Sequence, residues 1–357
     1  MKSKHSVLLA FLFSVLFAAF MLTAAKVNAA SDPENQTDVF VEPWQVLVRQ
    51  ATTVKAGSFV VYDFNLIEGA RLLAQFQVEG GLNDTIQVFF LDYPNFQLYS
   101  ARRPFKYYRG LSGSARRVAN AEFKVSQAGV YYLILDNRNA LLLPRNVTLH
   151  VDSVLPQVTP ESEEVRKSFE AMYLGLKKVF IFPHFQTTVR HCGFVNAFSN
   201  PNITLCTELL EEMVTKGMGS AIAFVYFHEL GHTLMKQWGL PFWDNEDDAD
   251  GFATALLLQV NQSAIALQAA QFWASQNTST QDAVAKIWMD DRHSLSPQRA
   301  RNIIRWVNNR TDLVSRWEHI FIPNMQTTAL ESSLHDSEVL DKNLVRAELA
   351  RRGVSIP

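Results

Sequence analysis

The segment Gly217–Leu240 is apolar and free of proline, and it contains two histidines four residues apart. On a helix, His228 and His232 lie on the same face one turn apart, so both imidazoles can reach one metal ion. Glu229 lies one step round the same helix, where it can act on a water molecule as a general base. The segment therefore predicts a metal-binding helix, and the alternative is a helix whose two histidines are core side chains.

A cluster of acids follows this helix. A catalytic zinc ion takes three protein ligands and keeps one position open, so a carboxylate is needed downstream. Glu246 lies 14 residues after His232 and opens the apolar helical stretch Ala249–Val260. We predict that Glu246 is the third ligand and that Asp250, one turn further on the same face, orients a ligand histidine. The alternative is that these acids are there because the helix dipole favours negative charge at a helix start. Four acids so close together, at positions 246, 247, 248 and 250, repel one another, and this repulsion favours a cation among them.

The combination of His228-Glu229-Leu230-Gly231-His232 with Glu246-x-x-Ala249-Asp250 resembles the gluzincin zinc metallopeptidases, whose third ligand is the Glu of a Glu-x-x-x-Asp motif. An Asn-Ala-Phe segment before the helix, a Leu-Pro pair after it and a later Asp-x-His-Ser-Leu segment are similar to an uncharacterised bacterial metallopeptidase family. The resemblance covers roughly residues 190–307. It implies an endopeptidase and says little about the substrate.

The resemblance also assigns roles outside the helix. Asn196 and Ala197 would belong to an edge strand that holds an extended substrate, as in thermolysin-type enzymes. His293 would stabilise the oxyanion and Arg299 would bind or orient the site, although Ser294 stands where the related element has proline. The alternatives are an ordinary strand at Asn196 and a capped helix beside a surface His293.

We therefore expect one zinc ion per chain and hydrolysis of a peptide or protein substrate. Zinc would activate a water molecule, and Glu229 would take its proton and pass it to the leaving amine. One alternative is a catalytically inactive zinc-binding scaffold, and another is an exported binding protein with a coincidental motif. A net charge of −2 gives no reason to expect nucleic acid. The sequence leaves the oligomeric state open.

The N-terminus has the pattern of a signal peptide. Lys2 and Lys4 precede an apolar run from Val7 to Ala25, and cleavage after Ala29 fits the small residues there. The sequence therefore predicts a signal peptide at 1–29, a leader at 30–38 and a periplasmic or extracellular protein. The alternative is an uncleaved membrane anchor, because the run is long enough to span a bilayer, so membrane or envelope association stays open.

Composition and turn signals divide the remainder into two domains of α+β class. Short alternating runs at 39–154, such as Phe40–Val48 and Val130–Leu135, predict an antiparallel β-sandwich with a binding or accessory role. Its order of motifs resembles p24/GOLD-like and prepeptidase-type modules. The segment 155–160 reads as a linker with two prolines. A mainly helical zincin-like metallopeptidase domain follows at 161–357, and Thr159 as N-cap with Pro160 at the first helical position predicts the start of its first helix.

Two cysteines, Cys192 and Cys206, flank a turn at Asn200-Pro201-Asn202. The two runs predict a small edge hairpin, and the cysteines of an exported chain predict a disulfide that clamps it. The alternative is that they bind zinc, although the proposed site already has its ligands.

Overall fold

The computed structural model describes residues 39–80, 84–115, 118–276, 296–336 and 340–354. It divides into an N-terminal unit, Glu42–Ser162, and a C-terminal unit that contains the chain from Glu163 onward together with Val39–Val41. Antiparallel sheets make up the N-terminal unit and helices dominate the C-terminal one, so the predicted mixed α+β class is confirmed. The predicted signal peptide, the leader and His293 lie outside the described residues.

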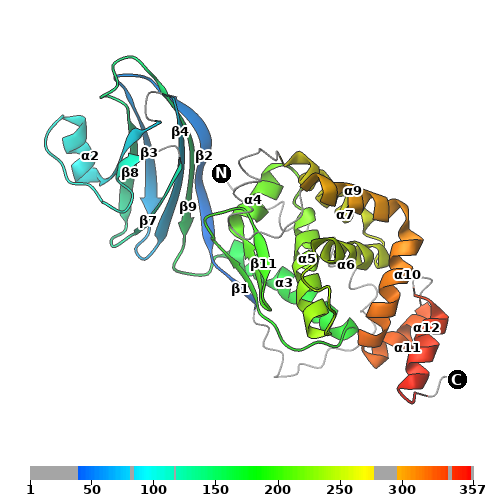
Figure 1. Cartoon of the computed structure of the whole chain (residues 1–357). Coiled ribbons are helices and arrows are strands. Elements are labelled where there is room, and N and C mark those ends of the chain that lie inside the picture. The colour runs from blue at the N-terminus through cyan, green and yellow to red at the C-terminus, as the bar shows by residue number, and fades with distance from the viewer. Residues whose placement is uncertain (1–38, 81–83, 116–117, 277–295, 337–339, 355–357) are drawn as a thin grey trace. The chain divides into compact units, whose positions relative to one another are not determined.

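The N-terminal unit consists of two four-stranded antiparallel sheets with the strand orders β2-β9-β4-β7 and β3-β8-β5-β6 (Figure 1). Their bounds are β2 (Trp44–Val54), β3 (Phe59–Leu66), β4 (Arg71–Glu79), β5 (Ile86–Asp92), β6 (Gly113–Ala115), β7 (Val118–Lys124), β8 (Gly129–Asp136) and β9 (Arg145–Val154).

One hydrophobic core lies between these sheets. Along β4, Leu72 and Phe76 are buried while their neighbours Leu73 and Gln77 are not, as the two-residue period of a strand requires. Phe90 of β5 belongs to the same core cluster, so both sheets contribute to it. The alternation that the sequence shows therefore follows from burial of one face of each sheet.

A helix not predicted from the sequence, α2 (Tyr93–Ser100), follows β5 and packs against β5 and β8. Asp92 caps it by accepting a hydrogen bond from the Asn95 amide at 3.0 Å, and a proline stands in its first turn. Phe96 stacks on Tyr132 with ring centroids 4.0 Å apart. The Asp cap and the early proline were the available signals.

The C-terminal unit combines a small sheet with a set of helices. The predicted start of α3 is confirmed, because the Thr159 hydroxyl accepts a hydrogen bond from the Ser162 amide at 3.1 Å. The elements are β1 (Val39–Val41), α3 (Pro160–Val179), β10 (Thr187–Arg190), β11 (Ala197–Ser199), β12 (Ile203–Cys206), α4 (Thr207–Thr215), α5 (Ala221–Gln237), α6 (Glu246–Gln259), α7 (Ser263–Ser275), α9 (Ser296–Asn308), α10 (Arg310–Phe321), a 3-10 turn η1 (Ile322–Asn324), α11 (Thr327–Asp336) and α12 (Lys342–Arg351).

The sheet of this unit has the order β1-β10-β12-β11, with β1, β10 and β12 parallel and β11 antiparallel at one edge. The run Phe40–Val48, predicted as one strand, is two strands that belong to different units. Pro43 lies between them, and it has no amide hydrogen to donate to a sheet.

Helices α5 and α6 lie side by side at the centre of the C-terminal unit (Figure 1). Every residue of α5 from Ala221 to Met235 is buried, which explains why the helix is apolar all round. A Cβ on Gly231 would meet the Phe252 side chain of α6 at 3.2 Å. The glycine therefore allows the close helix contact that brings the start of α6 to the two histidines.

Within the described parts of the chain, none of the helices combines the length and the apolar character that crossing a bilayer requires.

Candidate metal centre

The structure brings together His228 and His232 of α5 and Glu246 at the first position of α6. The two Nε2 atoms are 3.2 Å apart. Glu246 Oε2 lies 3.1 Å from Nε2 of His228, and Oε1 lies 3.3 Å from Nε2 of His232. Both histidines are buried, so three potential ligand atoms meet in a small space shielded from water.

The outer nitrogens of the two rings fix where their protons lie. His232 Nδ1 is 2.7 Å from the backbone carbonyl oxygen of Trp243, which can only accept, so this nitrogen carries the proton. His228 Nδ1 is 2.8 Å from Asp250 Oδ1, a carboxylate oxygen that can only accept, and 3.2 Å from a terminal nitrogen of Arg299. We assign its proton to Nδ1 because the shorter contact is the one with the acceptor. Both Nε2 atoms are then the ring atoms that can bind a metal ion next to the Glu246 carboxylate.

This donor set fits a zinc ion. With bonds of about 2.0–2.1 Å and tetrahedral angles, neighbouring ligand atoms should lie roughly 3.3 Å apart. The observed separations among the three groups are 3.1–3.3 Å. Three acceptor groups at such distances repel one another unless a cation lies among them, and two imidazoles with one carboxylate are ligands that zinc accepts.

Asp250 and Arg299 form a buried ion pair next to His228. Arg299 Nε and a terminal nitrogen donate to the two Asp250 oxygens at 2.8 and 2.7 Å. Burial alone would raise the pKa of Asp250, but Arg299 and His228 outweigh it and lower the pKa to about 2. Asp250 therefore stays ionised as the acceptor for the His228 ring. Arg299 was predicted to bind substrate or to orient the site, and the structure places its side chain against Asp250 and His228.

The charges around His228 favour a cation at its ring. Burial and the Arg299 charge lower the pKa of His228, yet Asp250 and Glu246 outweigh them and raise it to about 9. Without a metal ion the ring would therefore hold a second proton, on Nε2, near neutral pH, and a bound metal ion would take the place of that proton. Glu229 is buried beside His228 on α5. Burial would lower the pKa of Arg299, but Asp250, Glu246 and Glu229 together raise it, so Glu229 lies within electrostatic reach of the pair.

The acidic cluster at the start of α6 has protein partners as well. Asp247 accepts a hydrogen bond from the Asn302 side chain at 2.9 Å, and Asp248 pairs with Arg316. We expected a metal ion to relieve the repulsion among these acids. Two of them are instead paired with arginines, Asp248 with Arg316 and Asp250 with Arg299. Of the acids in this cluster, Glu246 is the one whose carboxylate meets both histidines.

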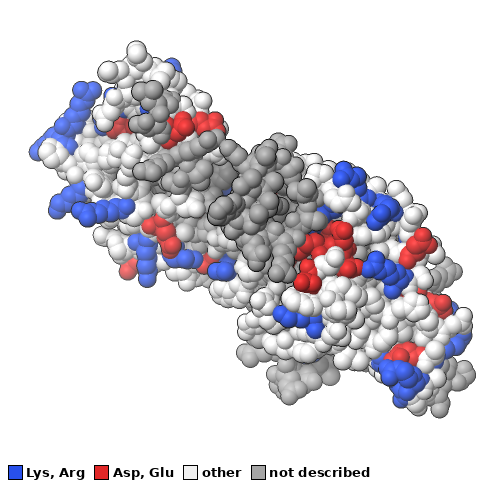
Figure 2. Space-filling model, viewed as in Figure 1, with Lys and Arg blue, Asp and Glu red and all other residues white. Residues whose placement is uncertain are grey.

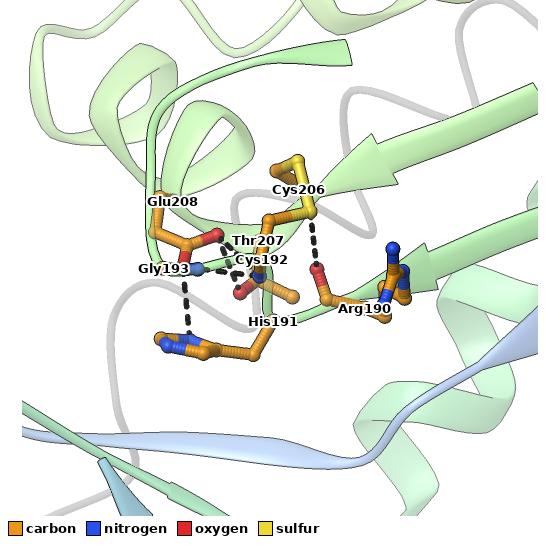
Figure 3. The surroundings of a disulfide bond; sticks show 7 residues. All are labelled: Arg190, His191, Cys192, Gly193, Cys206, Thr207 and Glu208. Carbon is orange, nitrogen blue, oxygen red and sulfur yellow. Dashed lines mark hydrogen bonds and ion pairs between the residues drawn. A yellow bond between two sulfur atoms is a disulfide. The ribbon is translucent and has the colours of Figure 1, made fainter. Parts of the chain in front are cut away.

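The predicted disulfide is confirmed, and it joins Cys192 to Cys206 (Figure 3). The hairpin that it was expected to clamp is shorter than predicted, because β11 and β12 pair only from Ala197 to Leu205. Cys192 lies in the loop before β11. The Glu208 carboxylate also fixes this loop by accepting from the amides of Cys192 and Gly193 (Figure 3).

Asn196 and Ala197 lie where this loop enters β11, the edge strand beside α5. The Asn196 carbonyl oxygen accepts a hydrogen bond from the Cys206 amide at 3.1 Å. Ala197 is buried and pairs with Leu205.

The sequence analysis did not predict the contact between His232 and the backbone carbonyl of Trp243. A backbone group is present in every residue, so the residue type gives no signal for such a contact.

His228, His232 and Glu246 form a group that could hold a metal ion through side chains of two neighbouring helices. Residues 161–310 match the model of a family described as "Putative metallopeptidase". This match supports a metallopeptidase family and suggests a metal, for which these three residues are candidate ligands.

Other comparisons add little. No curated protein matches the chain. Among solved structures, the crystal structure of Aeromonas hydrophila PliG, a periplasmic lysozyme inhibitor of g-type lysozyme, is similar at 10% sequence identity with a TM-score of 0.21, over 32% of this chain and 98% of that chain. A likeness of this degree carries no conclusion about this protein.

Proposed function

We propose that this chain is an exported, zinc-dependent peptidase of the gluzincin type, with His228, His232 and Glu246 as the metal ligands. The observation that carries the proposal is the geometry of three groups: Nε2 of His228, Nε2 of His232 and the Glu246 carboxylate lie 3.1–3.3 Å from one another. A divalent cation among the three groups would account for this arrangement. The family match over residues 161–310 supports the metallopeptidase part of the proposal.

When bound, the metal would supply a Lewis acid that polarises the peptide carbonyl and makes a water molecule acidic. Glu229 would take the proton from the attacking water and donate it to the amine that leaves. Asp250 would hold the His228 ring through Nδ1, and Arg299 would keep Asp250 ionised and in place. The Trp243 carbonyl would do the same for His232 without adding charge.

The edge strand β11 supports binding of an extended peptide. In the described sheet β11 pairs with β12 on one side only, which leaves its other side for strand addition. This side would align a substrate backbone along α5, and Asn196 and Ala197 would lie at the start of the strand.

We also propose a zincin-like fold for the C-terminal unit. The N-terminal unit would be a β-sandwich with an accessory role.

The test is metal analysis together with cleavage of a peptide library by the wild type and by Glu229→Gln. Wild type should contain about one zinc ion per chain and cleave peptides. The variant should keep the metal and lose at least about 100-fold in kcat, because it lacks the base. A matched control is Glu212→Gln, since Glu212 pairs with Lys216 on α4 away from the histidines.

Two outcomes would contradict the proposal in different ways. Equal cleavage by wild type and Glu229→Gln would exclude Glu229 as the base. A wild type that holds zinc but cleaves nothing in the library would favour the inactive scaffold that the sequence also allows.

A further inference from the structure

Three consecutive leucines lie at the tip of the loop between β8 and β9 in the N-terminal unit. Leu141, Leu142 and Leu143, called here the leucine tip, are 92%, 86% and 48% exposed. Single exposed leucines are ordinary, but adjacent large aliphatic side chains held in solvent mark an interaction site. The proposed peptidase reaction makes no use of them.

The loop that carries the leucine tip is held in place by hydrogen bonds. The buried Asn137 side chain donates to the carbonyls of Val54 and Leu143, both at 3.1 Å. The Gly57 amide donates to the carbonyls of Asn137 and Ala140 at 3.2 and 3.1 Å. The exposed leucines are therefore presented by a braced loop, which limits the conformational entropy lost when they bind a partner.

The Arg145 side chain completes this bracing. Its Nε donates to the Thr85 carbonyl at 2.8 Å, and a terminal nitrogen donates to the Leu143 and Pro144 carbonyls at 3.3 Å. The aromatic ring of Phe59, itself 38% exposed, lies next to the loop at the start of β3. The guanidinium of Arg138 lies over this ring, 5.3 Å from its centroid.

Basic side chains lie at the same end of the sheets as the leucine tip. Lys55 lies in the neighbouring β2–β3 turn, and Arg102 and Arg103 follow α2, whose Tyr99 hydroxyl donates to Asp136 at the end of β8. Figure 2 shows Lys and Arg side chains gathered on the side of this unit where α2 lies. Among the described residues at this end of the sheets, the basic ones are Lys55, Arg102, Arg103, Arg138 and Arg145, and the acidic ones are Glu79, Asp84 and Asp136.

We propose that the leucine tip inserts into the interface of an anionic lipid bilayer, with Lys55, Arg102 and Arg103 against the headgroups. The chemistry favours lipid over a protein partner. Exposed aliphatic side chains on a loop, with Lys and Arg at the same end of the sheets, fit an acyl boundary below a layer of phosphates. Protein interfaces instead concentrate their binding energy in tryptophan, tyrosine and arginine, and leucine is under-represented there. The proposal does not depend on the peptidase activity.

The test uses one added thiol as a local reporter. The chain has two cysteines and both are in the disulfide, so Leu142→Cys can be labelled at one position. The label is an environment-sensitive fluorophore. Its emission intensity should rise and its emission maximum should move to shorter wavelength when the exported, full-length protein is mixed with vesicles that contain phosphatidylglycerol. A quencher attached to the lipid chains should reduce this signal.

The matched control is Ala128→Cys with the same label. Ala128 is exposed in the turn before β8, at the opposite end of the strand from the leucine tip. Its fluorescence should stay that of a solvent-exposed site. A vesicle signal at residue 128 equal to that at residue 142, or no signal at 142, would overturn the proposal, and in the second case a protein would become the expected partner.

Two further variants separate the apolar and the charged contributions. Leu141→Ser with Leu142→Ser should lower vesicle binding by at least about tenfold, because the transfer of two leucines from water is lost. Arg102→Ser with Arg103→Ser should weaken binding to phosphatidylglycerol vesicles and reduce its salt dependence. Equal binding to phosphatidylcholine and phosphatidylglycerol vesicles would contradict the role assigned to the basic residues.

Discussion

Arg299 of α9 and Asp250 of α6 form a bidentate ion pair in which both side chains are almost completely buried, at 4% and 0% exposure. Asp250 in turn contacts the Nδ1 atom of His228 at 2.8 Å. A pair of residues 49 positions apart thus fixes the orientation of a candidate metal ligand.

Loss of Arg299 should destabilise the C-terminal unit strongly. Arg299→Ala leaves a carboxylate buried without its cation, and breaking a buried pair in this way costs about 3–5 kcal/mol. Six of the seven tryptophans lie in the C-terminal unit, so tryptophan fluorescence in a denaturant titration reports its unfolding. The control is Arg301→Ala on the same helix, where the side chain is exposed and bonds to Gln298. Equal midpoints for the two variants would contradict a structural role for the pair.

Removal of the Glu246 carboxylate should weaken metal binding. Glu246→Ala deletes one of three ligands, so zinc affinity should fall by more than about 100-fold, beyond the range typical of outer-shell changes. Competition with a fluorescent chelator measures this affinity. Asp247→Asn is the neighbouring control, because Asp247 bonds to Asn302 rather than to the histidines. If both variants bound zinc equally well, Glu246 would not be a ligand.

Low pH should destabilise the N-terminal unit around Asp136. Burial alone would raise the pKa of Asp136, but its bonds from Arg138 and Tyr99 lower it below the usual value. The pair therefore stabilises the fold above the unfolded pKa of about 3.9, and this stability is lost as the pH falls toward the lower folded pKa. Hydrogen exchange of β8 amides should show protection that falls below about pH 4.

The matching variant is Asp136→Asn, in which this part of the acid dependence should disappear. Asp63→Asn, at an exposed position of β3, should keep the wild-type pH profile. An unchanged profile in Asp136→Asn would show that other carboxylates control the acid transition.

Loss of the disulfide should affect substrate binding more than turnover. The bond closes a short loop with a sequence separation of 14, so Cys192→Ala with Cys206→Ala should cost about 3 kcal/mol of unfolding free energy. The freed loop leads into β11, so KM for a peptide should rise while kcat changes little. Dithiothreitol should have the same effect on the wild type and none on the double variant. A fall in kcat at constant KM would argue against the edge strand as the substrate site.

Local sequence patterns predicted much of the fold. An apolar, proline-free run indicated α5, and Thr159-Pro160 indicated the start of α3. Alternating residues located most strands of the N-terminal unit, because each strand buries one face. What the sequence did not show is pairing between distant strands. The run from Thr188 to Cys206 is divided into β10, a loop and the hairpin of β11 and β12, with β10 parallel to β12, and no local signal marks this division.

The site shows the same limit. Helical spacing brought His228, Glu229 and His232 to one place, and the count of ligands required by zinc led to Glu246. The partner of Arg299 depends on how α9 packs against α6, which periodicity does not determine. The outer-nitrogen contact of His232 is with a backbone oxygen, so residue type carries no information about it.

The first strand among the described residues, β1, pairs in parallel with β10, from Val39 with Thr187 to Val41 with Val189, before the chain enters the N-terminal unit. In connectivity, the N-terminal unit is thus an insertion near the beginning of the C-terminal unit. During translation, the whole inserted unit would be synthesised before β10, the strand that pairs with β1. The small sheet can therefore form only after residues far downstream have been made. A protein cut at residue 155 to isolate the helices would lose β1, and the bare side of β10 would then be available for pairing with other chains.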